Sequence, residues 1–316
     1  MGDGDSTDGP SSASAAFELV GNEIRAEILR VPSEVRRGEL PPALAFSELR
    51  DRIDARPGSS QFNYHLRRLL GTYVERRGSG SAQLAAEFVE DEEGYALRPG
   101  GTLLTRVVAA MAPPDGGDDA RVDPFDADLD CYFCGAAVRA RYENRIFQLR
   151  CSGCGHLYVY TLTPPGVLAG DPGRAALLDR AATYLRRKYT TFARGGCPLC
   201  AGGVEPTIIA PDVVNWPGAD RLAAVVRRTC DHCGNTNYAL LGTELLHDPE
   251  LVAFARRHGR EVTDVELRTL PFAVTDRHTE VVSTDPWTAT LTVPAGETSL
   301  TLRVDDGLTV REYVRE

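Results

Sequence analysis

Lysine is almost absent from this 316-residue chain, in which Lys188 is the single lysine among 35 basic residues. Tyr189 follows it, so the G-x-x-x-x-G-K-S/T loop that cradles nucleotide phosphates is excluded. The sequence also lacks the H-E-x-x-H, G-x-S-x-G and G-x-G-x-x-G motifs of zinc proteases, serine hydrolases and dinucleotide-binding enzymes. These absences remove common catalytic frameworks, and we expect that the protein is not an enzyme.

Long apolar runs are missing as well, and none approaches the roughly 18 residues that a membrane-spanning helix needs. Residues 1–16 are acidic and rich in small residues, and they lack the basic and apolar regions of a signal peptide. We therefore expect a cytoplasmic protein that makes no contact with a membrane.

Acidic residues outnumber basic ones, which gives a formal net charge of −10 and a pI near 5.2. The excess is uneven, because residues 131–233 carry 13 basic residues against 7 acidic ones. A lysine-poor, Asp-rich surface suits a protein that works in concentrated salt, although a GC-rich genome produces the same composition. At about 1 M salt the Debye length is only ~3 Å, so a negative net charge is a weak argument against nucleic-acid binding.

The N-terminal third has the order of elements of a winged helix-turn-helix. Hydrophobic residues recur at helical spacing from Phe17 to Ile28 in the first segment. Ser47 is a suitable N-cap for a second helix, and Ser59 or Ser60 for a third. The predicted elements are helices at 16–30, 48–54 and 59–70, strands at 73–77 and 94–98 around a long acidic tip, and a helix at 102–112.

The third of these helices is the candidate recognition helix. Phe62, Leu66 and Leu69 fall on one stripe that should face the core. The opposite stripe carries side chains that can donate and accept hydrogen bonds at base edges, and arginines on the following strand are placed for phosphates. The candidate DNA-contacting residues are Ser59, Ser60, Gln61, Asn63, Tyr64, Arg67, Arg68, Arg76 and Arg77. The alternative is a solvated helix face on a winged helix that binds protein.

All eight cysteines lie in four C-x-x-C pairs, and none is left over. Two such pairs separated by some 16–30 residues are typical of a tetrahedral metal site, because one pair fills only half of the shell. In sequence order, the ligands are Cys131, Cys134, Cys151 and Cys154 at one site and Cys197, Cys200, Cys230 and Cys233 at the other. With all four positions taken, a catalytic ion is disfavoured, and we expect two structural Zn²⁺ ions in two zinc ribbons.

Other interpretations of the cysteines are open. An interleaved cross-brace is an alternative pairing, and Fe–S ligation also uses four cysteines. Disulfides need an oxidising compartment, and redox C-x-x-C chemistry needs a single exposed pair, so both are disfavoured. His156 and His232 lie near the cysteines and are better interpreted as polar neighbours than as ligands. The stretch between the first two pairs predicts a hairpin that turns at residues 143–144.

The rest of the chain completes a multidomain α+β organisation. Asp248-Pro249-Glu250 begins a helix that Gly259 ends, and a three-stranded meander follows. Asp276, His278 and Glu280 alternate on an expected strand, where a polar face is commoner than a metal or catalytic site. The predicted domains are a disordered acidic tail (1–16), a winged helix-turn-helix DNA-binding domain (17–112), an acidic linker (113–130), a first zinc ribbon (131–165), a helical connector (166–194), a second zinc ribbon (195–246) and a small α+β sensory or docking domain (247–316).

The N-terminal segment resembles a known family. The run S-S-Q-F-N-Y-H-L-R-R-L at 59–69 is similar to the recognition helix of ArsR-type winged-helix repressors, whose signature includes H-L-x-x-L. NEIRAEILR at 22–30 and FSELRDRI at 46–53 resemble their first two helices. The whole chain resembles regulators of halophilic archaea that join this domain to zinc ribbons and to a C-terminal domain with a segment like TDRHTEVVSTDPW at 275–287. Metal-sensing members carry cysteines on the second helix, and residues 47–53 have none, so metal sensing is not carried over.

The first expectation is therefore a sequence-specific transcriptional regulator that binds double-stranded DNA. We also expect a homodimer, because the apolar stripe of Leu103, Val107 and Met111 has no obvious partner beyond the first helix, and such regulators read two-fold operators. A small-molecule or protein effector would act at the C-terminal domain. Two other functions stay open: a general transcription factor that engages RNA polymerase, since a winged helix plus a zinc ribbon also describes the archaeal factor resembling TFIIE, and a zinc-ribbon adaptor without DNA readout.

Overall fold

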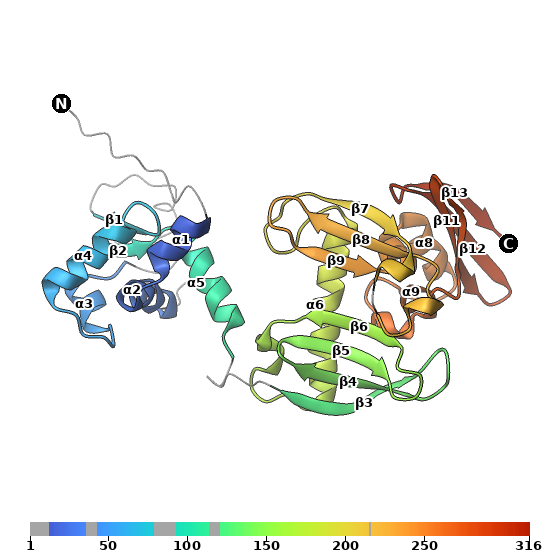
Figure 1. Cartoon of the computed structure of the whole chain (residues 1–316), viewed down its shortest axis with the longest axis horizontal. Coiled ribbons are helices and arrows are strands. Elements are labelled where there is room, and N and C mark those ends of the chain that lie inside the picture. The colour runs from blue at the N-terminus through green and yellow to red at the C-terminus, as the bar shows by residue number, and fades with distance from the viewer. Residues whose placement is uncertain (1–12, 36–42, 79–92, 114–120, 215) are drawn as a thin grey trace. The chain divides into compact units, whose positions relative to one another are not determined.

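The computed structural model describes residues 13–35, 43–78, 93–113, 121–214 and 216–316. Helices and strands are mixed in this part of the chain, and the strands form four antiparallel sheets, so the fold is α+β (Figure 1). The chain divides between Ala112 and Pro113 into two units. Among the described residues, no helix has both the length and the apolar character needed to cross a membrane.

The first unit combines helices with one short hairpin. Its elements are α1 (Ala13–Val20), α2 (Glu23–Glu34), α3 (Phe46–Asp51), α4 (Ser59–Leu69), β1 (Val74–Arg77), β2 (Gly94–Leu97) and α5 (Pro99–Met111). Phe62, Leu66 and Leu69 on α4 are fully buried, as their helical spacing predicts. They share one core with Ile28 on α2 and Leu49 on α3.

The helix expected at residues 16–30 is two helices, and the prediction of a single one is wrong. The chain breaks at Gly21 and Asn22. The Asn22 side chain accepts a hydrogen bond from the Arg25 backbone N–H (3.2 Å) and so caps α2. The capping residue Asn22 therefore starts a new helix within a segment whose apolar spacing predicts a single one.

The serine caps expected for the next two helices are also wrong. Helices α3 and α4 begin directly after Ala45 and Gly58, neither of which offers a side-chain hydrogen bond. Ser47 is the second residue of α3, and Ser59 is the first residue of α4. Serine identifies the neighbourhood of each helix start but not the capping position.

The second unit opens with an antiparallel sheet in the order β3-β4-β5-β6. Its strands are β3 (Val122–Asp130), β4 (Ala137–Glu143), β5 (Ile146–Cys151) and β6 (Leu157–Leu162). A two-residue turn joins β4 to β5, and Asn144 and Arg145 have φ values of 51° and 62° there. Positive φ at both positions is the geometry of a tight hairpin, so the predicted hairpin is present and turns one residue later than expected.

Strand β3 occupies the second half of the segment predicted to be an acidic linker (113–130), so that prediction is wrong for residues 122–130. Phe125 and Ala127 are buried in the sheet's core and alternate with exposed aspartates. This period of two is a strand signal, and the Pro- and Asp-rich composition conceals it.

Helix α6 (Arg174–Ala193) connects the first sheet to the second (Figure 1). Leu177, Ala181 and Leu185 pack in the core of the first sheet, and Phe192, about two turns further along, packs against Cys197 and the second sheet. A short 3₁₀ turn, η1 (Pro165–Leu168), precedes α6. The second sheet, in the order β7-β8-β9, comprises β7 (Val204–Ile209), β8 (Val225–Cys230) and β9 (Thr236–Ala239), with 3₁₀ turns η2 (Pro211–Val213) and η3 (Ala219–Arg221) between β7 and β8.

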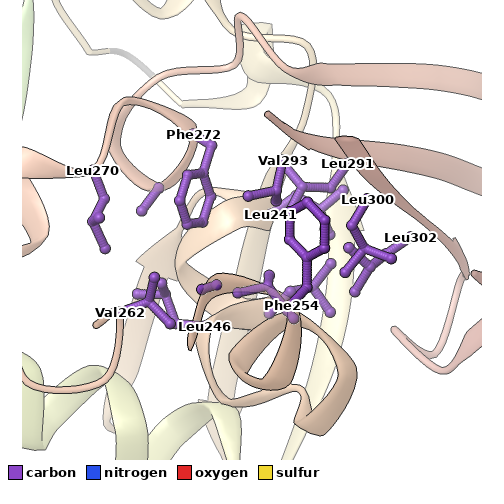
Figure 2. Packing of buried hydrophobic residues seen from close by; sticks show 14 of the residues in the cluster. Leu241, Leu246, Phe254, Val262, Leu270, Phe272, Leu291, Val293, Leu300 and Leu302 are labelled. Carbon is purple, nitrogen blue, oxygen red and sulfur yellow. The ribbon is translucent and has the colours of Figure 1, made fainter. Parts of the chain in front are cut away.

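The C-terminal region places short helices on one face of a meander. Its elements are α7 (Leu241–Glu244), η4 (Leu245–His247), α8 (Pro249–Arg257), η5 (Leu267–Thr269), α9 (Pro271–Val274), β10 (Thr279–Thr284), β11 (Trp287–Ala295), β12 (Thr298–Asp305) and β13 (Val310–Arg315). The sheet has four strands in sequence order, one more than predicted. Asp248 caps α8 as predicted, and the helices' Leu241 and Phe254 pack on Leu291 and Leu300 of the sheet (Figure 2).

A buried ion pair joins the second sheet to this region. Arg228 Nε on β8 lies 2.7 Å from Glu244 Oε2 on α7, and Arg228 Nη2 also donates to the Ala193 carbonyl at the end of α6 (3.4 Å). Burial raises the pKa of Glu244, and the Arg228 guanidinium opposes that shift. One guanidinium thereby ties three elements together.

We expect Gly242→Ala to destabilise the second unit by about 1–3 kcal/mol or more, because overpacking a buried site forces the backbone to move. A Cβ at Gly242 on α7 would lie 1.8 Å from the Phe272 carbonyl oxygen, where α7 meets α9. Gly166→Ala is the control, since a Cβ there would meet nothing within 4 Å. Urea unfolding measures both variants, and equal stabilities would contradict the close approach of α7 and α9.

Candidate metal centres and nucleic-acid interface

The first candidate metal centre forms where two cysteine pairs flank the hairpin β4–β5. Cys131 and Cys134 lie between β3 and β4, Cys151 is the last residue of β5, and Cys154 lies between β5 and β6. All four sulfurs lie within 4.8 Å of one another. The Cys134 and Cys151 sulfurs are 3.4 Å apart, and those of Cys131 and Cys154 are 3.7 Å apart. Gly135, which follows the first pair, has a φ of 74°, which lets the chain turn back after the ligand.

Backbone N–H groups point at the sulfurs of this centre. Those of Phe133 and Gly153 donate to Cys131 and Cys151 at 3.4 and 3.3 Å. The pKa of Cys154 is lowered to about 6, because the His156 backbone N–H and a guanidinium both donate to its sulfur. Donors of this kind favour the thiolate, which is the form that binds metal.

The second candidate metal centre repeats the arrangement on the second sheet. Cys197, Cys200, Cys230 and Cys233 also lie with their sulfurs within 4.8 Å of one another. The recorded sulfur–sulfur separations are 3.4 Å, 3.5 Å and 3.6 Å. Burial raises the pKa of Cys197, but the backbone N–H groups of Cys200 and Leu199 outweigh it, and the value falls to about 6. Ala201 takes a positive φ of 58° where the other pairs have glycine.

The donor sets fit a single tetrahedral ion. A disulfide needs about 2.05 Å between sulfurs, whereas the eight thiols are free. An ion with metal–sulfur bonds near 2.3 Å separates its sulfurs by about 3.8 Å, close to the spacing in both groups. The cysteines group in sequence order, as predicted, and the cross-brace does not form. Neither His156 nor His232 belongs to either group.

Three side chains that the sequence did not single out contact the sulfurs. Tyr158 Oη lies 3.2 Å from the Cys131 sulfur, and Asn235 Nδ2 donates to Cys197 at 3.5 Å. Arg221 Nη1 donates to Cys154 at 2.9 Å from 67 residues away. Tyr158 and Asn235 lie within four residues of a cysteine, so their position in the sequence could have identified them as neighbours of the sulfurs. The contact of Arg221 could not be identified in this way, because it depends on the fold.

The predicted DNA-contacting residues of α4 lie on its outer face. Ser59, Ser60, Gln61, Tyr64, Arg67 and Arg68 are exposed, and Asn63 is half-buried. The Ser59 hydroxyl accepts a hydrogen bond from Arg50 (2.8 Å), and Arg68 donates to the Tyr64 hydroxyl (3.4 Å). His65 is buried beside the core, which lowers its pKa. The helix therefore separates a polar outer stripe from an apolar inner one.

The two arginines predicted to hold phosphates differ. Arg76 is exposed on β1, whereas the Arg77 side chain is only 11% exposed and its Nε lies 2.9 Å from Glu75 Oε1. Arg77 is therefore held in an ion pair rather than presented at the surface, which corrects that assignment. The tip at residues 79–92 lies outside the described residues.

The trio Asp276, His278 and Glu280 does not share a strand face, so that prediction is wrong. Strand β10 begins at Thr279, and Asp276 is buried before it. Asp276 Oδ2 accepts hydrogen bonds from the backbone N–H groups of Ala223 (2.6 Å) and Ala224 (3.2 Å). Burial raises the Asp276 pKa to about 6 despite these bonds. The carboxylate anchors a neighbouring loop.

Comparison with known proteins gives two family matches. A domain of unknown function (DUF7347) matches residues 13–110, and a second one (DUF7351) matches residues 128–310. No curated protein and no solved structure matches the chain. The two matched ranges lie on either side of the division between the two structural units.

The metal centres predict two tightly bound metal ions per chain. Cys131→Ser and Cys230→Ser should each remove one ion, because each breaks a different four-thiol set. Native mass spectrometry of the purified chain counts the ions directly. A wild-type chain that carries fewer than two ions, or a single substitution that removes both, would contradict two independent sites.

Proposed function

Because the chain belongs to the DUF7351 family through residues 128–310, with a separate family match ahead of that range, we propose a protein with two working parts. The first unit is a winged helix-turn-helix of ArsR-like type that reads double-stranded DNA. The second contains two structural zinc ribbons and a docking region. Together they make a sequence-specific transcriptional regulator of the cytoplasm, without enzymatic activity.

Zinc is the proposed ion at both centres because of the chemistry of the donor set. Four thiolates fill a tetrahedral shell and leave no position for a substrate, which is typical of structural zinc. An iron–sulfur cluster of several irons would hold its cysteines farther apart than the 3.4–3.7 Å recorded here. Bound zinc would offset half of the charge of the four thiolates, and its binding energy would add directly to folding energy.

The outer stripe of α4 is the observation that carries the proposal of DNA reading. Ser60, Tyr64 and Arg67 are exposed together on one face, and Tyr64 is 57% exposed. Hydroxyl and guanidinium groups are what base edges in the major groove recognise. The order of α3, α4 and the hairpin β1–β2 supports placing α4 in that groove, with β1 beside the backbone.

An adaptor that binds protein without reading DNA is the second candidate. It is favoured by Tyr160 and Leu162 on β6, which are 61% and 65% exposed. Residues 247–316 make up the docking region. Under either function, this region is the proposed site for a small-molecule or protein effector. Chromatin mapping separates the candidates: discrete operators support the regulator, occupancy of most promoters supports a general transcription factor, and no enrichment supports the adaptor.

We expect Asn63→Ala or Arg67→Ala to cost about 1–3 kcal/mol of binding free energy on the native operator and to relax preference at one base position. Arg76→Ala should instead weaken binding to every sequence and reduce the salt slope by about one unit. Arg77→Ala is the matched control, because its partner is Glu75 rather than a phosphate. Binding isotherms across a salt series, on operator and scrambled DNA, measure all four variants. Identical behaviour of the Asn63 and Arg76 variants would overturn the assignment of α4 as the reader.

We also propose that the regulator is a homodimer through α5. Leu103, Val107 and Met111 form a stripe on this helix and are 64%, 52% and 39% exposed. An apolar stripe of this kind is typical of a helix that pairs with a second copy, and a dimer would present two copies of α4 to a two-fold operator.

Val107→Glu should therefore shift the chain from dimer to monomer in sedimentation at molar salt. Ala109→Glu adds the same charge about 120° from Leu103 around the helix, since successive residues are about 100° apart, and should leave the dimer intact. A wild-type monomer at micromolar concentration would refute this interface.

A further inference from the structure

The two metal centres are built alike but differ in the connection between their strands. We call each of the two sheets, with its four cysteines, a cysteine module: the first has strands β3–β6 and the second has strands β7–β9. In the first module a two-residue turn joins β4 to β5. In the second, residues 210–224 separate β7 from β8 and include η2 and η3. Part of this longer connection, residues 216–221, packs on the second sheet through Trp216 and Ala219 and also reaches the first metal centre.

Residues 216–221 lie against the first metal centre. The Leu157 backbone N–H donates to the Pro217 carbonyl at 3.1 Å. Gly218, with a φ of 87°, lies so close to the buried His156 ring that an added Cβ would be 2.4 Å from Nδ1. Only glycine fits both that conformation and that approach. The connection is therefore shaped to lie on the segment that follows Cys154.

Arg221 brings a cation to the first metal centre from this position. Its Nη1 donates to the Cys154 sulfur at 2.9 Å, and its guanidinium lies 5.4 Å from the centroid of the Phe133 ring. Arg277 lies over the same ring, also at 5.4 Å. Phe133 lies between Cys131 and Cys134 in the sequence, so its ring holds both guanidinium groups next to the loop that carries these two ligands, and Arg221 is the one that contacts a sulfur.

The position of Arg221 is fixed by a buried carboxylate. Asp276 accepts hydrogen bonds from the Ala223 and Ala224 N–H groups, two and three residues after Arg221. Arg277 follows Asp276 directly. One short segment of the C-terminal region thus holds the connection in place and supplies the second cation.

The second metal centre lacks this feature within the part of the chain that the structure describes. The side-chain donor recorded on its sulfurs is the Asn235 amide, which is neutral, at 3.5 Å from Cys197. The burial of the cysteines is otherwise alike: each centre has two buried cysteines, one half-buried and one exposed. The side-chain partners recorded at the sulfurs are therefore the Tyr158 hydroxyl and the Arg221 guanidinium at the first centre and the Asn235 amide at the second, and Arg221 is the charged one.

We propose that Arg221, supplied by the second cysteine module, is an outer-sphere partner of the first metal centre that slows both the loss of its metal and the attack of electrophiles on Cys154. Four thiolates around a divalent ion carry a net charge of −2, and a charge-assisted hydrogen bond draws electron density from the sulfur that accepts it. Groups that orient and neutralise metal ligands typically change metal affinity 10- to 100-fold. The first centre is then the inert one of the two.

Pulse alkylation of the full zinc-loaded chain tests this proposal. N-ethylmaleimide is added with excess EDTA, and peptide mass spectrometry follows the labelling of each cysteine over time. In the wild type, Cys230 and Cys233 should be labelled before Cys151 and Cys154. Arg221→Met keeps the length of the side chain, and it should speed labelling of Cys151 and Cys154 about 10- to 100-fold while leaving the second centre unchanged.

Two further variants complete the test. Arg221→Lys should restore part of the protection, because it keeps the charge with a less suitable donor geometry. Arg227→Met on β8 is the control on the same module, and should change neither centre. Unchanged labelling of Cys154 in Arg221→Met overturns the inference, as does equal acceleration at both centres. If Arg221→Met does not fold, the lysine variant decides, and wild-type rates at both its centres contradict the proposal.

This inference rests on the metal-binding part of the proposed function and is independent of DNA reading. A wild-type chain that binds no metal would end both together. A chain that binds two ions and protects them equally would end only the inference, because the metal count and the labelling rates are separate measurements.

Discussion

Repulsion among four converging thiolates is the constraint on which the second unit depends. Each set of four cysteines joins the two ends of a hairpin, so the ligands can meet only when the strands between them are paired. Without a cation, two thiolates within 4 Å of each other oppose the fold that brings them together. A bound metal ion attracts the thiolates and outweighs the repulsion between them, so that folding and metal binding become one equilibrium.

The rest of the second unit extends outward from these two centres. Helix α6 places Leu185 in the core of the first sheet and Phe192 beside Cys197, so that one rigid helix spans both modules. The buried Arg228–Glu244 pair continues the connection into the C-terminal region. The contact between Arg221 and Cys154 links the connection between β7 and β8 directly to the first metal centre. One family match, over residues 128–310, includes residues of all three parts of the unit.

Sequence reasoning succeeded where local spacing decides the structure. The cysteine spacing predicted both ligand sets, and the apolar period of Phe62, Leu66 and Leu69 predicted the buried face of α4. It failed where composition concealed a pattern, as in β3, whose aspartates hide the alternation of Phe125 and Ala127. It could not foresee the role of Arg221, because its partner Cys154 lies 67 residues away. The pairing of Arg77 with Glu75 was within reach of the sequence, because residues two apart on a strand share one face.

X-ray absorption spectroscopy at the zinc edge, on the purified full chain, tests the central claim most directly. The account predicts an average shell of four sulfurs at about 2.3 Å, without nitrogen or oxygen, because cysteines alone surround each centre. A shell that contains nitrogen or oxygen, or that averages fewer than four sulfurs per ion, would contradict it.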